Sequence, residues 1–171
     1  MTLLDGDAFS ACFDDFERSA WRFETQPVYT MPDEQESLNR FLAGEARPIG
    51  HNDDWHEEVH AWVSAGKSIG RVRTVRQPLT DYQRYQLAWG IPGNVEAGED
   101  IRILDQTRSD LGLPAQDFWL FDDSVVVHLN FAPDGTLDNI EQPDAPDLSK
   151  YLAWREIALA HAVPFAEYDP S

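Results

Sequence analysis

The feature that most constrains the fold is a run of three strand-like segments in the last third of the chain. Residues 117–121, 125–131 and 136–141 are rich in β-branched and aromatic side chains, and the links between them, DDS and PDG, are turn sequences. Segments of this kind, separated by Asp, Ser, Pro and Gly, are typical of antiparallel strands joined by tight turns. We therefore predict an antiparallel meander over residues 117–141.

The remaining sequence supplies helices that can cover such a sheet, together with further strands. Apolar residues at three- and four-residue spacing predict helices within residues 7–19, 32–44, 53–66, 80–90 and 147–163. Shorter apolar stretches predict strands at residues 21–25, 68–76 and 101–104. Helices interleaved with strands predict a mixed α/β fold, with a central mixed or antiparallel sheet flanked by helices.

Two details of this prediction depend on proline and glycine. Pro27 follows the strand at residues 21–25, so we expect that strand to continue through Val28 and Tyr29 at an edge of the sheet. Gly90 and Pro92 are expected to break the helix that Thr80 caps.

The chain of 171 residues is long enough for one hydrophobic core. We expect a single domain over residues 1–171, with a helical N-terminal part (7–66), a sheet-rich part (67–141) and a C-terminal helix (147–163).

The formal net charge of −18 is unevenly distributed. Residues 1–66 hold 14 acids and 4 bases, residues 67–108 hold 5 and 7, and residues 109–171 hold 12 and 2. This charge should repel phosphates and anionic lipid surfaces, so we expect no direct nucleic-acid binding and no membrane binding. The N-terminus carries acids where a secretory signal would carry bases, and we therefore expect a cytoplasmic protein.

A cluster of charged and aromatic residues is the main candidate for a ligand site. Its members, drawn from the basic middle of the chain and from the meander, are Arg71, Arg73, Tyr82, Arg84, Asp117, Trp119 and Asp122. Alternation places Arg71 and Arg73 on one face of their strand, and a guanidinium in the same sheet can meet a carboxylate in bidentate fashion. The cluster is either a structural lattice of ion pairs or an anion pocket of Arg71, Arg73 and Arg84 with Trp119 as its wall.

The sequence HEEVH at residues 56–60 matches a zinc-hydrolase motif. His56 and His60 lie four residues apart on the expected helix and can bind zinc, with Glu57 as the general base. The alternative is a chance match on an acidic, solvated helix face. No GxSxG, GxxxxGK[ST] or GxGxxG sequence is present, and the chain has one cysteine, so we expect no cofactor and no resident metal.

Several longer strings resemble one family. These are GRVRTVRQPLTDYQRYQLAW, the later GED, DFWLFDDSVVV and the closing AVPFAEY, and the similarity extends over nearly the whole chain from FDDFERSAWRFET onward. The family is an uncharacterised group of small acidic actinobacterial proteins, known as a domain of unknown function. Its members are often encoded beside helix-turn-helix regulators, which implies a regulatory or antitoxin-like setting.

The order of strands and helices after residue 67 also resembles half of a phospholipase D-like domain. That superfamily carries an HxKxxxxD motif on the equivalent hairpin. Here the corresponding stretch begins at Asp117, with Trp119 in place of the lysine and Ser124 in place of the aspartate. The resemblance therefore implies a degenerate domain that senses or docks rather than cleaves phosphodiesters.

We expect a non-catalytic regulatory or protein-interaction protein. Its acidic surface would dock a basic partner such as a DNA-binding regulator, and the arginine cluster would hold an anionic ligand. The alternative is a small hydrolase or other small-molecule enzyme, acting through His56, Glu57 and His60 or through Arg71, Arg73 and Asp117. A third hypothesis, mimicry of nucleic acid, requires acidic side chains spaced like phosphates along one face.

Overall fold

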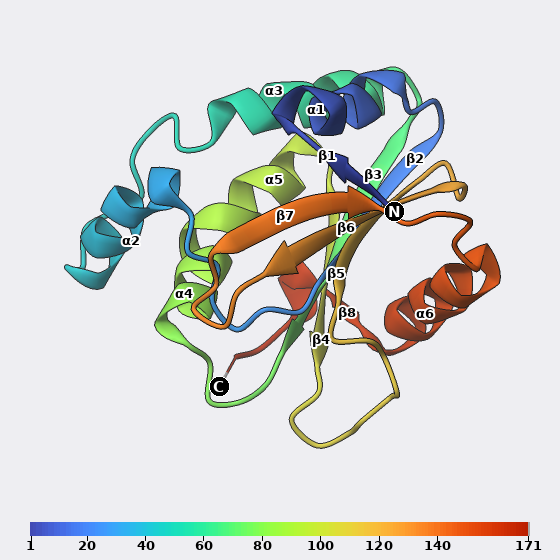
Figure 1. Ribbon diagram of the computed structural model, residues 1–171. Helices are drawn as coiled ribbons and strands as arrows, with labels where there is room; N and C mark the ends of the chain where they lie inside the picture. Colours follow the sequence, from blue (N-terminus) through green and yellow to red (C-terminus); the bar gives the residue numbers. More distant parts are fainter. Residues whose placement is uncertain (171) are drawn as a thin grey trace.

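The computed structural model describes residues 1–170 and contains one eight-stranded mixed sheet (Figure 1). In spatial order the strands are β1 (Thr2–Leu4), β7 (Leu137–Gln142), β6 (Val125–Phe131), β5 (Asp117–Phe121), β2 (Ser19–Glu24), β3 (Ser68–Val75), β4 (Asp100–Asp105) and β8 (Val163–Pro164). β2, β3 and β4 are parallel, whereas every other neighbouring pair is antiparallel. The predicted mixed α/β fold and the meander β5–β6–β7 are confirmed.

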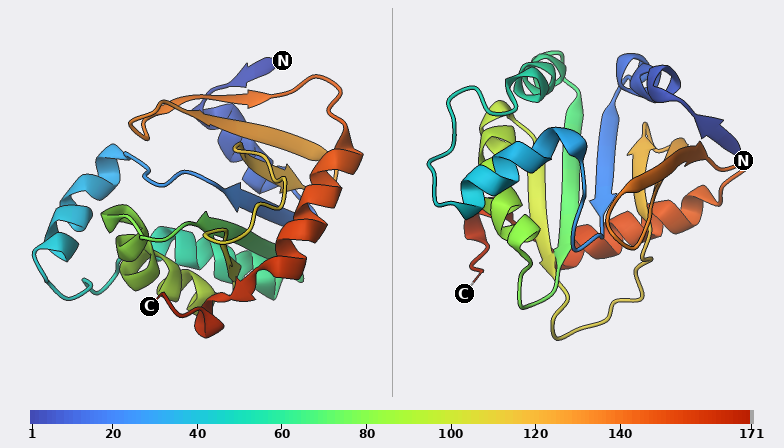
Figure 2. Two further views of the ribbon diagram at one scale, coloured as in Figure 1. Left: turned by 90° about the horizontal axis from the view of Figure 1, so that it is seen from below. Right: turned by 60° about the vertical axis from the view of Figure 1, so that its left-hand side comes forward.

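Helices cover both faces of this sheet (Figures 1 and 2). They are α1 (Gly6–Asp15), α2 (Gln35–Leu42), α3 (Asp53–Ser64), α4 (Asp81–Tyr85), α5 (Ile91–Ala97) and α6 (Leu148–His161), with 3-10 turns η1 (Pro32–Glu34) and η3 (Phe165–Glu167) and a π-helical turn η2 (Gln86–Gly90). Within residues 1–170, none of these helices combines the length and apolarity needed to cross a bilayer.

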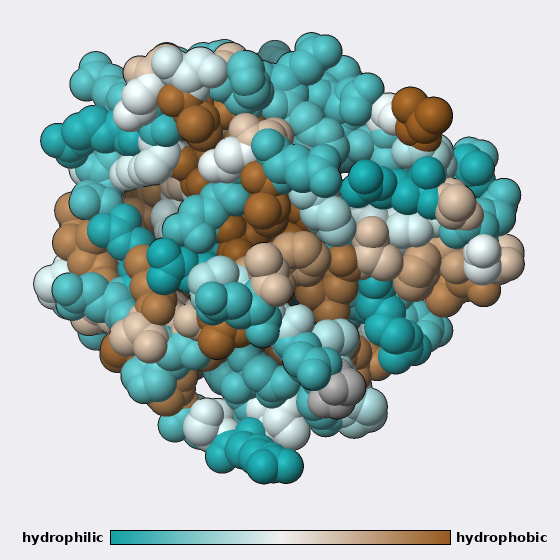
Figure 3. Space-filling view, turned by 180° about the vertical axis from the view of Figure 1, so that it is seen from behind, coloured by the Kyte–Doolittle hydropathy of each residue, from teal (hydrophilic) through white to brown (hydrophobic). Residues whose placement is uncertain are grey.

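The alternation of side chains along β5 separates two hydrophobic cores. Trp119 and Phe121 point to the face covered by α1 and α3, whereas Phe118 and Leu120 point to the face covered by α6. Each of these side chains is almost fully buried and contributes about 1.5–3 kcal/mol through the hydrophobic effect. Seen from behind, the molecule shows apolar side chains in the middle of one face with hydrophilic residues around them (Figure 3).

The prediction that β2 is an edge strand is wrong. β2 lies in the middle of the sheet, antiparallel to β5 on one side and parallel to β3 on the other. The strand ends at Glu24, so Pro27 lies outside the ladder and its missing N–H costs no strand hydrogen bond. The proline therefore marks where the strand has stopped, and not its position in the sheet.

Gly90 and Pro92 also do not end the helix that follows Thr80. α4 continues through the π turn η2 into α5, which ends at Gly98 with a left-handed φ of 115°. Pro92 lies in the first turn of α5, where a missing N–H is tolerated. The π turn is also where the Gln86 side chain reaches toward β3.

The β6–β7 turn fixes the segment that follows β2. The Thr30 amide donates to the Gly135 carbonyl at 2.9 Å, and Gly135 has a φ of +87°. A Cβ at Gly135 would lie 2.5 Å from the Val28 carbonyl oxygen, so this close approach requires glycine.

We predict that Gly135→Ala lowers the free energy of unfolding by about 3 kcal/mol, through backbone strain and this clash. Gly112→Ala is the matched control, because Gly112 has a φ of +68° with nothing within 4 Å of its Cβ. The control isolates the strain and should lose only about 1 kcal/mol in urea unfolding. Equal losses in the two variants would show that the contact with Val28 is unimportant.

Candidate functional site

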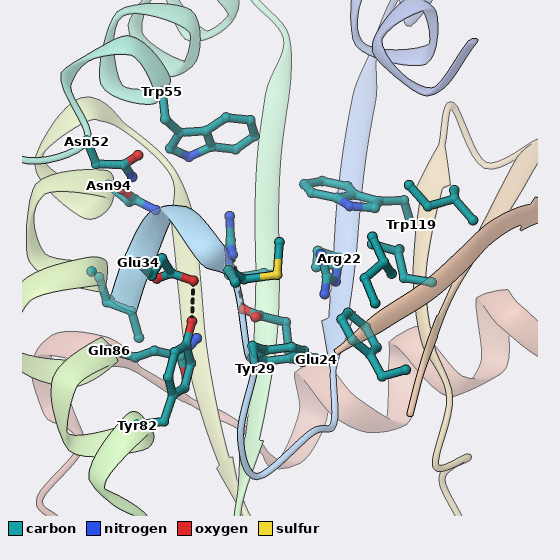
Figure 4. A pocket seen from close by; sticks show the side chains of 18 of the residues that line it. Arg22, Glu24, Tyr29, Glu34, Asn52, Trp55, Tyr82, Gln86, Asn94 and Trp119 are labelled. Carbon is teal, nitrogen blue, oxygen red and sulfur yellow. Dashed lines mark hydrogen bonds and ion pairs between the residues drawn. The ribbon is translucent and has the colours of Figure 1, made fainter. Parts of the chain in front are cut away.

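A cavity of about 420 Å³ opens on the sheet face that carries α1, α3 and α5 (Figure 4). Side chains of β2, β3 and β5 form its floor, and the helices and the segment between β2 and α2 form its walls. A volume of this size falls within the range of small-molecule binding sites.

Aromatic rings supply much of the apolar wall. Phe13 of α1 lies edge-on to Trp55 of α3 at 5.9 Å and to Trp119 of β5 at 5.0 Å between ring centroids. On the opposite side, Tyr29 and Tyr82 meet edge-on at 5.7 Å. All five rings line the cavity.

The charged floor follows from the strand register. Arg22 of β2 pairs with Arg71 of β3 on one side and with Trp119 of β5 on the other, so the two arginines are direct neighbours on one face. Two like charges at such a position are unfavourable unless carboxylates lie next to them. One step along the strands, Glu24 of β2 and Asp117 of β5 supply those carboxylates.

Arg71 forms ion pairs with two carboxylates of the network. Its Nη1 donates to Glu24 at 3.1 Å, while Nε and Nη2 donate to the two carboxylate oxygens of Glu99. Glu99 precedes β4 and also accepts from the indole N–H of Trp55 at 2.9 Å. Arg71 therefore joins β2, β3, the start of β4 and α3 through a buried network.

Asp117 forms the second centre of the network and is only 1% exposed. Its carboxylate accepts from Arg22 Nη2 at 2.9 Å, from the Thr25 amide at 2.9 Å and from the Tyr29 hydroxyl. Arg22 makes one hydrogen bond to Asp117, through Nη2. The central carbon of its guanidinium lies 5.8 Å from the ring centroid of Trp119 and 5.9 Å from that of Tyr29.

Arg73 is 1% exposed and lies beneath the cavity. Its guanidinium donates to Gln86 Oε1 at 2.7 Å and to the carbonyls of Gln26 and Thr74 at 2.5 and 3.1 Å. These partners are neutral, and the guanidinium also lies 5.2 Å from the Tyr29 ring. Arg73 therefore ties β3 to the π turn and to the chain after β2.

The network shifts the ionisation of its members in opposite directions. Burial alone would raise the pKa of Glu24, but the charges of Arg71, Arg22 and Arg73 outweigh it and lower this pKa to about 2. Burial raises the pKa of Glu34 on η1, an effect that the hydrogen bond from Tyr82 opposes. Burial also raises the pKa of Tyr29 and Tyr82, so both hydroxyls remain hydrogen-bond donors.

The structure brings together part of the cluster that the sequence indicated. Arg71, Tyr82 and Trp119 line the cavity, and Arg73 and Asp117 lie in the network beneath it. Arg71 meets Glu24 and Glu99 instead of Asp117, because β2 lies between β3 and β5.

Arg84 and Asp122 lie outside this site. Arg84 is exposed on α4 and pairs with Asp81 three residues away. Asp122 is in the β5–β6 turn, at the far end of β5 from Asp117, and accepts hydrogen bonds from the backbone amides of Glu17, Arg18 and Ser19. It holds the start of β2, and this explains its position without a ligand.

Several cavity residues were not identified from the sequence. They are Arg22, Glu24, Tyr29, Glu34 and Trp55, and the buried Glu99 that bonds Arg71 and Trp55 was likewise not identified. Arg22 and Glu24 did give a signal, because they alternate with Trp21 and Phe23 and so place two charges on one face of a strand that is apolar on the other. Glu99 gave none, since its partners are distant in sequence.

The HEEVH motif lies on α3 in a separate surface groove with Glu96. His56 Nε2 is 2.9 Å from Asn94 Oδ1, and the ring packs on Gly93, where a Cβ would come within 2.4 Å of it. His60 is exposed. Across residues 1–170, no three His, Cys, Asp or Glu side chains are arranged to hold a metal ion.

Comparison with known families gives one match. The family model described as domain of unknown function DUF6879 matches residues 7–170. The chain belongs to this family. No curated protein matches the DUF6879 chain. The match covers every element that lines the cavity, so the site described above lies entirely within the DUF6879 domain.

We predict that Glu24→Gln destabilises the protein by about 3 kcal/mol at pH 7, because it removes a buried partner of Arg71. The pKa of Glu24 is lowered from 4.5 to about 2, so its ionised form stabilises the fold above pH 4.5 and this contribution is lost as the pH falls toward 2. The difference between wild type and variant in the free energy of unfolding, measured with urea, should therefore narrow between pH 5 and pH 2.5. The size of the change should be on the order of the free energy that corresponds to the pKa shift of Glu24. Exposed Glu17→Gln is the control and should show no gap, and a gap independent of pH would contradict the assignment.

Proposed function

We propose that this DUF6879 chain is a non-catalytic regulatory protein that binds a small molecule in the cavity above β2 and β3. The observation that carries the proposal is the cavity itself, a space of about 420 Å³ with aromatic walls above a hydrogen-bonded polar floor. A binding site of this construction holds its polar groups in place before the ligand arrives, which lowers the entropic cost of binding.

The state of the three carboxylates of the floor supports binding over catalysis. A general base works best with a pKa near the working pH, whereas the pKa of Glu24 is about 2. Glu99 is fully engaged by Arg71 and Trp55, and Asp117 by Arg22, Thr25 and Tyr29. Proton transfer at any of these groups would break the network that supports the sheet.

The surface supports a second part of the proposal, docking of a basic protein partner. The interior arginines Arg22 and Arg71 are paired with interior carboxylates, and Arg73 is buried among neutral partners, so they do not offset the acids outside. α1 and α3 lie next to each other at one end of the molecule (Figure 1). Their exposed acids are Asp7, Asp14, Asp15, Asp53, Asp54, Glu57 and Glu58. A basic DNA-binding regulator is the partner we propose for this surface.

The resemblance to small actinobacterial proteins encoded beside helix-turn-helix regulators agrees with this partner. The resemblance to a phospholipase D-like half-domain without its catalytic residues agrees with a role in sensing. On this proposal, ligand binding in the cavity alters how the acidic helices engage the regulator inside the cytoplasm.

Binding in the cavity can be tested by filling it. Gly90 lines the cavity in η2, its φ is compatible with other residues, and nothing lies within 4 Å of its Cβ position. We predict that compounds from a small-molecule library raise the melting temperature of wild type and of Gly90→Ala, but not of Gly90→Leu, whose side chain occupies the space. The variants themselves should remain folded, because glycine is unfavourable inside a helix. Equal responses of Gly90→Leu and wild type would place binding elsewhere.

Partner docking can be tested by neutralising one helix. The variant Asp53→Asn, Asp54→Asn, Glu57→Gln, Glu58→Gln should weaken binding to a purified helix-turn-helix regulator of the kind encoded beside the resembling proteins, on the order of tenfold at low salt. A control with Asp110→Asn, Asp138→Asn, Glu156→Gln and Glu167→Gln removes the same charge from exposed positions elsewhere. Equal weakening in both variants would indicate net charge alone, and no binding by wild type would remove this partner.

A further inference from the structure

With Glu34 of the wall included, the carboxylates in and beneath the cavity outnumber the arginines. Arg22 and Arg71 pair directly with carboxylates, Arg73 donates to neutral groups, and the three carboxylates of the network are each less than 5% exposed. The carboxylates are Glu24, Glu99 and Asp117. An anion brought into such a site would lose its hydration and meet more carboxylates than guanidinium groups. The site therefore disfavours an anionic ligand.

The cavity nevertheless has hydrogen-bonding groups left unused. Arg22 Nε is buried and has no hydrogen-bond partner among residues 1–170. An unsatisfied buried donor is costly, and an acceptor oxygen or nitrogen of a ligand beside this guanidinium would relieve that cost. Gln86 and Asn94 also line the cavity, and each uses its amide oxygen within the protein, which leaves the amide nitrogen as a donor.

The matching acceptor comes from another wall. Glu34 accepts from the Tyr82 hydroxyl at 2.7 Å through one carboxylate oxygen, and the second oxygen has no protein donor within residues 1–170. In Figure 4, Arg22 and Glu34 approach the cavity from different sides, with the aromatic rings between and above them. A ligand that reaches both needs an acceptor and an N–H donor on a flat body.

From these features we infer that the cavity takes an uncharged, planar heterocycle with adjacent acceptor and N–H groups, that is, a ligand of the nucleobase or nucleoside class. Its ring faces would contact Trp55 and Trp119, its acceptor would face Arg22, and its N–H would donate to Glu34. The inference rests on the proposed function and replaces the anionic ligand expected from the arginines with a neutral one.

The test is calorimetric titration of the full chain with uridine and adenosine, with their 5′-monophosphates, and with benzoate as an aromatic anion. We expect at least one nucleoside to bind saturably, and its monophosphate to bind at least about tenfold more weakly because its charge enters a site without an excess of positive charge. Gly90→Leu should abolish the binding. Tighter binding of the monophosphate or of benzoate would overturn the inference in favour of an anion site.

A matched pair of variants tests the role of Glu34. Glu34→Gln keeps a side-chain oxygen for Tyr82 but loses the charged acceptor, and should weaken nucleoside binding on the order of tenfold. Glu36→Gln, exposed on the adjoining helix, should leave it unchanged. Equal affinities of Glu34→Gln and wild type would overturn the proposed geometry.

The two proposals fail in different ways. If no nucleoside binds but another compound binds and is blocked by Gly90→Leu, the ligand class inferred here is wrong and the binding function stands. If Gly90→Leu blocks the binding of no compound of any class, both proposals fail.

Discussion

The architecture of this domain depends most on the hydrogen bonds of the buried Arg71 guanidinium. It lies on a central strand and bonds Glu24 of the neighbouring strand and Glu99 at the start of the next. A buried arginine costs several kcal/mol in lost hydration unless its donors are satisfied, so removing either carboxylate leaves an uncompensated charge. Glu99 also accepts a hydrogen bond from the Trp55 indole, so the same network attaches α3 to the sheet.

A hydrophobic replacement of this network could be equally stable, because buried ion pairs are weak evidence for stability in themselves. What the charges provide is a polar surface held rigidly at the centre of a sheet whose other face is mainly apolar beneath α6. Bulky apolar side chains at the same positions would fill the space that is now a cavity. The polar floor thus agrees with the proposed binding function.

Prediction from sequence succeeded where the interactions are local in the chain and failed where they join distant segments. β5, β6 and β7 were predicted because their turns are local, and the helical stripes because their periodicity is local. The central place of β2 was missed, since it depends on pairing with Ser68–Val75 and Asp117–Phe121, far along the chain. Arg71 and Trp119 were recognised as site residues from the alternation within their own strands. The same signal was present for Arg22 and Glu24 but was not used, whereas Glu99 could be assigned only once the strand order was known. The continuation of α4 through η2 was missed because a π turn has no simple sequence signal.

The ion pairs of the cavity floor join residues 28 to 95 positions apart in sequence, as in the pairs Arg71–Glu99 and Arg22–Asp117. No local segment can therefore assemble any part of this site by itself, and the cavity exists only after the non-local strand pairings have formed. Partial opening of the sheet at β2 would dismantle the floor and, on the proposed function, release a bound molecule in the same event. Occupancy of the cavity would then be coupled to the cooperative unfolding of the whole domain, and the lifetime of the bound state could not exceed the time for which the central strands stay paired.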